Sequence, residues 1–427
     1  MTLYVIKPGD SIYTIANKFG VSPQKIITAN GLENPGQLVV GESIIIPQGQ
    51  KVHTVAAGES VYSIARKYGI SQSSIIQANP FINAVGRIYP GQVLTIPVPG
   101  DEKLGEIEVN GYIFPGSDEA IVRPWLKSLT YLSIFSYTVN ADGSLPAIDD
   151  DKWIQIARSN RVAPIMVITN IRPGGGFSTE IAHAILSNQT VQNNLIENVV
   201  RILKQKNYYG LNIDFEYIQP TDRQNYNDFL RKITDRLHAL GYIVLTAVAP
   251  KLNAEQKGLL YEAHDYPAHG SIVDRVILMT YEWGYLAGPP QAVAPLSQVK
   301  RVLDYAVSVI PPKKILMGIP NYAYDWVLPY VRGTLASTFS NGEAVARAFR
   351  NKAEIKYDLN AQSPYYNYYD AQKRQHIDWF EDARSIYQKL LTVDQYGLGG
   401  VSYWTIGRSF QQNLFLVDAM FNIKKVI

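Results

Sequence analysis

From residue 105 onward, short apolar runs alternate with longer segments that have the periodicity of helices. This alternation predicts α/β architecture, with the apolar runs as strands. The expected strands are Ile107–Phe114, Tyr131–Tyr137, Ala163–Thr169, Gly210–Tyr217, Ile243–Ala249, Arg275–Trp283, Lys314–Tyr322 and Gly399–Thr405. Their number and the length of the segment predict a (β/α)8 TIM barrel over residues 105–427. The stretch at about 327–378 is too long for one helix, and predicts a small α+β insertion between strands seven and eight, at the barrel's mouth.

The fourth expected strand has an unusual polar face. Side chains alternate along a strand, so Asn212, Asp214 and Glu216 lie together, opposite a face of apolar residues. Helical segments at Thr190–Lys206 and Asp222–Leu240 flank this strand and indicate a βαβ unit that is covered on both faces. Burying an unpaired carboxylate is costly. The pattern therefore predicts a water-accessible cavity at the strand's end, although an exposed edge strand with one wet face would show the same alternation.

The first hundred residues contain an internal repeat. The segment Pro8–Ala16 reappears as Ala57–Ala65, and each copy ends in a glycine and an apolar strand that runs into Ile-Pro. We expect two strand–helix–helix–strand modules, at residues 1–48 and 50–98, in which Ser11 and Ser60 cap the first helix. A short polar linker is expected at residues 98–104.

These copies resemble LysM modules, small βααβ domains that bind glycans containing N-acetylglucosamine. In that family the glycan lies between the loop after the first strand and the loop after the second helix. The resemblance implies glycan contacts at Gly9, Asp10, Ser11 and Asn30, and at Gly58, Glu59, Ser60 and Asn79. The alternative is that these glycines and asparagines only build turns. Two tandem copies would increase avidity along a polymer.

Composition narrows the class of protein. Hydrophobic residues make up 46% and charged residues 18%, as in globular proteins, and a net charge of +3 gives no indication of nucleic-acid binding. The absence of cysteine excludes disulfides and thiolate chemistry. The histidines form no close pair except His264 and His269, which we expect to face solvent, so no metal and no cofactor are expected. No signal peptide and no membrane-spanning apolar run are visible.

The candidate catalytic and substrate-binding residues lie at the expected carboxyl ends of the strands, where the active sites of barrel enzymes are found. Asp214 and Glu216 end strand four, and the other candidates are Tyr281 after strand six, Tyr322 and Asp325 after strand seven, and Trp404 in strand eight. A carboxylate pair suits cleavage of a glycosidic bond, but two carboxylates on one strand cannot flank the sugar from opposite faces. One must be the acid, and a 2-acetamido group of the substrate can supply the nucleophile. As an anion, Asp214 would raise the pKa of Glu216.

The barrel resembles glycoside hydrolase family 18, whose strand-four motif is D-G-x-D-x-D-x-E. Here the motif stands as Tyr209-Gly-Leu-Asn-Ile-Asp-Phe-Glu216, with Tyr209 and Asn212 in place of two acidic residues. The resemblance implies that Glu216 is the general acid/base, that Asp214 polarises the acetamido group, and that Tyr281 hydrogen-bonds its oxygen. Trp404 would form the pocket floor, and Asn212, Tyr322 and Asp325 are candidate substrate contacts. The family's Ser-x-Gly-Gly of strand three appears here as Val167-Ile-Thr-Asn170.

Two LysM copies ahead of such a barrel resemble the cortex-lytic N-acetylglucosaminidases of endospore-forming bacteria. The resemblance implies a monomeric hydrolase of spore-cortex peptidoglycan that acts during germination in the spore coat, cortex or cell wall, without membrane insertion. A chitinase or another endo-N-acetylglucosaminidase would share the mechanism. A non-catalytic wall-binding or coat protein is the alternative of a different class, and the proton donor at Glu216 argues against it.

Overall fold

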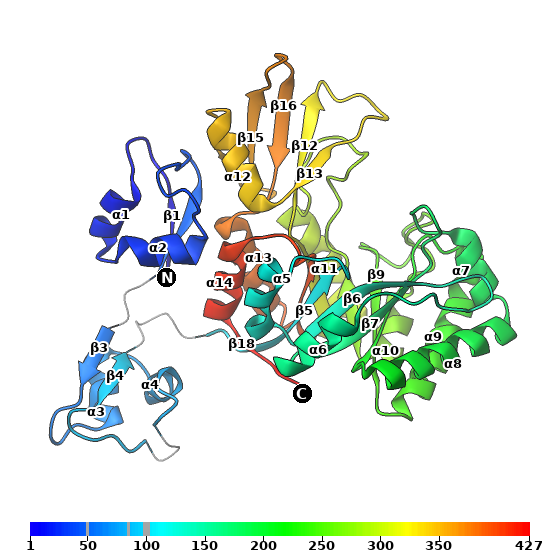
Figure 1. Ribbon diagram of the computed structural model, residues 1–427, viewed down its shortest axis with the longest axis horizontal. Coiled ribbons are helices and arrows are strands. Elements are labelled where there is room, and N and C mark those ends of the chain that lie inside the picture. The colour runs from blue at the N-terminus through cyan, green and yellow to red at the C-terminus, as the bar shows by residue number, and fades with distance from the viewer. Residues whose placement is uncertain (48–50, 83–85, 97–102) are drawn as a thin grey trace.

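The computed structural model describes residues 1–47, 51–82, 86–96 and 103–427 (Figure 1). Its centre is a closed barrel of parallel strands in which the first strand pairs with the last. The barrel strands are β5 (Glu106–Ile113), β6 (Tyr131–Thr138), β7 (Ala163–Thr169), β8 (Gly210–Asp214), β9 (Ile243–Val248), β10 (Arg275–Leu278), β11 (Ile315–Pro320) and β17 (Gly400–Trp404). The expected (β/α)8 barrel is confirmed. A short strand, β18 (Asn422–Ile423), extends the sheet beside β5.

Helices surround the barrel and bury its outer face. They are α5 (Glu119–Val122), α6 (Asp151–Ser159), α7 (Thr179–Leu186), α8 (Gln189–Lys206), α9 (Arg223–His238), α10 (Tyr266–Ile272), α11 (Leu296–Val309), α13 (Ala383–Gln395) and α14 (Gln411–Met420), with 3₁₀ turns at Arg123–Ser128, Pro220–Asp222 and Pro312–Lys314. The flanking helices α8 and α9 bury Leu195, Val199, Phe229 and Ile233 in the same core as Leu211 of β8. Strand β8 is therefore covered, and the alternative of an exposed edge strand is wrong.

Two expected strands, β8 and β10, end three or more residues before their predicted last residue. Strand β8 ends at Asp214 and β10 ends at Leu278, so Glu216 and Tyr281 lie in the loops that follow. The backbone N–H of Tyr281 donates to the Met279 carbonyl at 2.8 Å, within its own segment rather than to a neighbouring strand. These loops lie at the carboxyl ends of the strands, where they can close over a cavity.

The insertion between strands seven and eight is a five-stranded antiparallel sheet with one helix (Figure 1). It consists of β12 (Ala323–Leu328), β13 (Ser337–Phe339), α12 (Asn341–Arg350), β14 (Lys356–Asp358), β15 (Ser363–Tyr369) and β16 (Gln375–Trp379). Its sheet begins at Ala323, a few residues before the expected boundary, because β12 follows β11 after only a short turn.

Each N-terminal module has the expected βααβ order and its own apolar core. The first contains β1 (Thr2–Val5), α1 (Ile12–Phe19), α2 (Pro23–Asn30) and β2 (Ser43–Ile46). The second contains β3 (Lys51–Thr54), α3 (Val61–Tyr68), α4 (Gln72–Ala78) and β4 (Val93–Ile96). Ser11 and Ser60 form capping boxes at α1 and α3, as expected. Most of the expected linker, residues 98–102, lies outside the described residues.

No helix among the described residues has both the length and the apolar character that crossing a membrane would require.

Candidate active site

A cavity of about 190 Å³ lies at the carboxyl ends of the barrel strands. Four of the expected site residues line it: Asp214, Glu216, Tyr281 and Trp404. The remaining lining residues are Tyr112, Phe135, Phe177, Ala247, Ala249, Pro250, Leu260, Met279 and Glu282. The cavity thus combines three carboxyl groups and two tyrosine hydroxyls with apolar and aromatic walls, a composition typical of ligand sites.

The pKa values of the two strand-four carboxyl groups are raised. Burial raises the pKa of Asp214 to about 7, and its Oδ1 has no hydrogen-bond partner within the described protein. The pKa of Glu216 is raised well above its usual range, first by burial, then by the charge of Asp214 and then by that of Glu282. The sequence indicated the effect of Asp214 on Glu216, but burial is the larger cause. A protonated Glu216 near neutral pH is suited to act as a general acid.

The backbone that carries Glu216 is fixed from two sides. The Asn170 side chain accepts from the Glu216 N–H at 3.0 Å and donates to the Glu216 carbonyl at 2.8 Å. His264 holds the preceding residue, because its Nδ1 accepts from the Ala249 N–H and its Nε2 therefore donates to the Phe215 carbonyl at 2.9 Å. Sequence reasoning named neither residue as part of the site. The signals for Asn170 were its position directly after strand three and its place in the segment Val167–Asn170, which was compared with the Ser-x-Gly-Gly motif.

The expectation that His264 and His269 face solvent is wrong. Both are buried, with 1% and 0% of their surfaces exposed, and both rings pack against Tyr226 of α9. Burial lowers the pKa of His264 to about 4, so its imidazole is neutral at physiological pH and keeps the tautomer that binds Phe215.

Tyr281 reaches the cavity because a glycine on the next strand leaves room for its ring. A side chain at Gly318 would overlap the Leu278 carbonyl oxygen and would lie 2.8 Å from Cε1 of Tyr281. Burial, aided by the neighbouring acids, raises the pKa of Tyr281 well above its usual value. Its hydroxyl therefore keeps its proton and can donate a hydrogen bond to a substrate oxygen.

Glu282 is a third carboxyl group at the cavity, which sequence reasoning did not single out. It has a left-handed backbone conformation, with φ of 67°, although it is not glycine. The Tyr322 and Tyr324 hydroxyls both donate to its Oε1, the second at 3.0 Å. Tyr322 thus holds Glu282 and does not line the cavity itself.

Trp404 closes one wall of the cavity. Its ring packs edge-on against Phe135, with centroids 4.8 Å apart, and against Tyr112 at 5.3 Å. Asn212 lies beneath this wall, fully buried, and its Nδ2 donates to the Tyr112 hydroxyl while its Oδ1 has no partner in the described chain. Asn212 therefore supports the cavity from below rather than lining it.

Asp325 is not at the end of strand seven, contrary to expectation. The chain leaves the barrel at Pro320, and Asp325 lies within β12 of the insertion. There its Oδ2 accepts from Arg347 at 2.7 Å and from the Tyr368 hydroxyl at 3.1 Å, and His376 lies 3.0 Å away. The ion pair holds the insertion together and places the Asp325 carboxylate away from the lining of the catalytic cavity.

The candidate glycan contacts of the two modules make matching internal bonds. Asn30 and Asn79 are buried, and each amide bridges the end of its helix to the closing strand, at Ile45 and Thr95 respectively. The remaining side chains also bind within their own turns: Asp10 accepts from Lys7 N, Glu59 accepts from Ala56 N, and Ser11 and Ser60 cap helices. Gly9 and Gly58 have φ of 83° and 85° in exposed turns. Glycan contacts at these positions would use the backbone.

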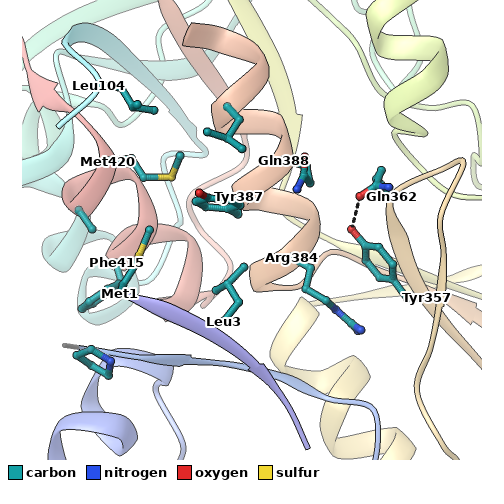
Figure 2. A pocket seen from close by; sticks show the side chains of 13 residues that line it. Met1, Leu3, Leu104, Tyr357, Gln362, Arg384, Tyr387, Gln388, Phe415 and Met420 are labelled. Carbon is teal, nitrogen blue, oxygen red and sulfur yellow. Dashed lines mark hydrogen bonds between the residues drawn. The ribbon is translucent and has the colours of Figure 1, made fainter. Parts of the chain in front are cut away.

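A larger cavity, about 650 Å³, lies elsewhere, between the first module and helices α13 and α14 (Figure 2). It is mostly apolar, with Leu3, Tyr387 and Phe415 among its walls, and it contains none of the strand-end carboxylates. It is therefore not the candidate active site.

The cavity and the barrel together define a glycoside hydrolase, and comparison with known families agrees. Residues 125–408 match the model of glycosyl hydrolases family 18, and residues 4–47 and 53–97 match that of the LysM domain. The chain belongs to glycosyl hydrolase family 18 and carries two LysM domains ahead of its catalytic barrel.

Relatives with the same architecture extend over the whole chain. It is 42% identical to the cortical fragment-lytic enzyme of Bacillus subtilis, over 100% of this chain and 99% of that protein. The enzyme of the same name from Bacillus anthracis is 41% identical over 99% of both. The crystal structure of the Bacillus megaterium spore cortex-lytic enzyme SleL superposes with a TM-score of 0.86 at 41% identity, covering 100% of this chain and 99% of that one.

Proposed function

We propose that this protein hydrolyses spore-cortex peptidoglycan by cleaving β-1,4 bonds after N-acetylglucosamine, with retention of configuration. Family membership and the full-length similarity to enzymes named for lysis of cortical fragments support this substrate. The observation that carries the mechanism is the position of Asp214, the last residue of β8, and Glu216, just after it, which line one cavity. Carboxylates from a single strand end leave the opposite face of the sugar without a protein nucleophile.

The substrate's own acetamido oxygen fills that role in the proposal. Glu216 gives its proton to the glycosidic oxygen as the bond to C1 breaks, and the acetamido oxygen attacks C1 to form an oxazolinium ion. Asp214 orients the acetamido N–H, and the Tyr281 hydroxyl donates to the acetamido oxygen. Glu216 then takes a proton from water, which attacks C1 and regenerates the acetamido group. Asp214 is buried and Glu216 and Tyr281 are partly buried, and this limited access of water strengthens these interactions.

The three parts of the chain have different roles in this proposal. Residues 105–427 carry catalysis, and residues 1–48 and 50–98 hold the enzyme, as a monomer, on peptidoglycan in the spore cortex or cell wall. The cavity of about 190 Å³ suits the sugar at the cleaved bond, whereas the LysM modules suit an extended polymer.

Product analysis tests the proposal. Spore cortex and vegetative wall are digested, and mass spectrometry identifies the sugar at the new reducing end, which should be N-acetylglucosamine. Muramic acid at that end would contradict the assigned bond. The matched control is Glu216→Gln, which removes the proton donor while keeping the side chain's size. It should lose about 10³-fold or more in turnover and still bind insoluble peptidoglycan.

A further inference from the structure

A further pocket, separate from the catalytic cavity, is lined by basic side chains. Its volume is about 460 Å³. Arg123 and Lys127 come from the 3₁₀ turn after α5, Arg161 from the turn between α6 and β7, and Lys425 from the tail after β18. Among the described residues that line this pocket, none is acidic. Arg161 lies at the amino end of β7, opposite to the strand ends that form the catalytic cavity.

Two of the four basic side chains already have acidic partners beside the pocket. Lys127 Nζ lies 2.7 Å from Oδ2 of Asp418, and Arg123 forms an ion pair with Glu119. The Glu119 carboxylate is shared with Lys152, whose Nζ lies 2.6 Å from its second oxygen. Two carboxylates therefore serve three cations, and they do not neutralise the other two basic groups of the pocket.

Those other two groups, Arg161 and Lys425, form no ion pair with any residue that the structure describes. The exposed Arg161 guanidinium donates no hydrogen bond within that part of the chain, so its five N–H groups are available to a ligand. Lys425 Nζ donates to the carbonyls of Leu126, at 2.9 Å, and Leu129, which leaves it one N–H group. Burial, and after it the charge of Arg161, lowers the pKa of Lys425 to about 8, although Asp418 opposes this. A bound anion would relieve the repulsion between the two cations.

The chemistry of the pocket favours an organic carboxylate. A guanidinium matches a carboxylate with two parallel hydrogen bonds, and an ammonium can hold a second carboxylate as a point charge. Pro124, Leu126 and Leu414 add apolar wall, which suits an anion with a carbon skeleton. A water molecule occupies about 30 Å³ of liquid, so the pocket has room for several groups of a peptide. Peptidoglycan carries its carboxylates on short peptide stems attached to the glycan strand.

We propose that this basic pocket binds the carboxylate groups of peptidoglycan stem peptides, with Arg161 and Lys425 as the principal contacts. The source of the carboxylates rests on the proposed function, whereas the preference for an organic carboxylate follows from the pocket alone. The pocket shares no lining residue with the catalytic cavity, so it holds the wall away from the bond that is cut. It gives the enzyme a contact with the peptide in addition to its contacts with the sugar.

Binding of a stem tripeptide that contains no sugar tests the pocket. Calorimetric titration of the full-length protein at low ionic strength compares the tripeptide with free carboxylates and the same tripeptide with its carboxylates amidated. Wild type should bind the amidated form at least about tenfold more weakly, because the charge-assisted hydrogen bonds are lost. Arg161→Gln should weaken binding of the free form by about tenfold or more for the same reason.

Lys352→Gln is the matched control. Lys352 follows α12 as Arg161 follows α6, both are exposed, and their φ values are 52° and 54°. The two substitutions therefore remove one positive charge each from the same backbone conformation, and only Arg161 lines the pocket. Lys352→Gln should bind the free tripeptide as wild type does. Equal affinities of the two variants, or equal binding of the free and amidated tripeptides, would overturn the proposal.

A third variant covers the case in which Arg161→Gln lowers the unfolding temperature. Arg161→Lys keeps the positive charge but loses the planar fork of the guanidinium. An affinity closer to that of wild type than to that of Arg161→Gln supports the proposal. A loss as large as that of Arg161→Gln overturns it.

A comparison of two wall preparations identifies the source of the carboxylates. Arg161→Gln is made in protein carrying Glu216→Gln, so that the wall is not digested, and is compared with its Glu216→Gln parent. It should bind intact wall more weakly than the parent does, and should bind wall whose stems an amidase has removed equally well. If citrate binds wild type as tightly as the tripeptide, and both proteins bind both walls alike, the ligand is a free carboxylate and the proposal is overturned. A wild type that cleaves no cortex would contradict the proposed function, but not the tripeptide result, because the tripeptide contains no glycosidic bond.

Discussion

Three carboxyl groups share one small cavity, and their charges act on one another. Glu282 contributes to the raised pKa of Glu216, which must be protonated to act as the acid. The rate constant kcat/KM should therefore fall as pH rises through the pKa of Glu216. Glu282→Gln removes a negative charge and keeps an acceptor for Tyr322, so the pKa of Glu216 should drop and the alkaline limb should move to lower pH, by up to about 1 unit. A pH–rate profile measures this shift, and an unchanged or more alkaline limb would contradict the role of Glu282. Strand alternation was enough to predict that Asp214 and Glu216 share a cavity, because it needs only local geometry. The roles of three other residues could not be predicted, because each acts through contacts between segments that are distant in sequence. These residues are Glu282, Asn170 and His264.

At the scale of elements, strand β11 positions Tyr281 through the absence of a side chain at Gly318. Gly318→Ala should force the Leu278–Tyr281 segment to move, which would cost about 1–3 kcal/mol of stability. It should also lower kcat about tenfold or more with a smaller change in KM, because the Tyr281 hydrogen bond strengthens in the transition state. Steady-state kinetics and thermal unfolding check both effects, with Gly116→Ala as control, since nothing lies within 4 Å of that position. If Gly318→Ala and Gly116→Ala have the same kcat and the same unfolding temperature, Gly318 is not needed to make room for Tyr281. All eight barrel strands could be predicted from apolar runs, but the ends of β8 and β10 could not, because the alternation of residues continues past the last ladder hydrogen bond.

At the scale of the whole molecule, the two LysM modules should differ in their effect on the stability of the barrel. Ile15 and Ile64 occupy equivalent buried positions in the two copies, 1% and 0% exposed. Ile15→Asp should unfold the first module and remove apolar contacts from the barrel, which lowers the barrel's unfolding temperature by about 2–4 °C for each kcal/mol lost. Ile64→Asp should leave the barrel transition unchanged. Differential scanning calorimetry of the full chain measures both, and equal barrel transitions would contradict the docking of the first module. The repeat could be predicted from sequence, but the asymmetry could not, because the contacts of Asn30 and Gly41 come from Gln412 and Ile355, far along the chain.

If the acetamido group of the substrate is the nucleophile, two substrates that differ only in this group should be hydrolysed at very different rates. The two soluble oligosaccharides are identical except that the sugar at the cleaved bond carries an acetamido group in one and a free amine in the other. The value of kcat/KM for the amine should be lower by about 10⁵-fold or more, because the amine lacks the attacking group that the acetamido sugar holds next to C1. Equal hydrolysis of both substrates would contradict this mechanism.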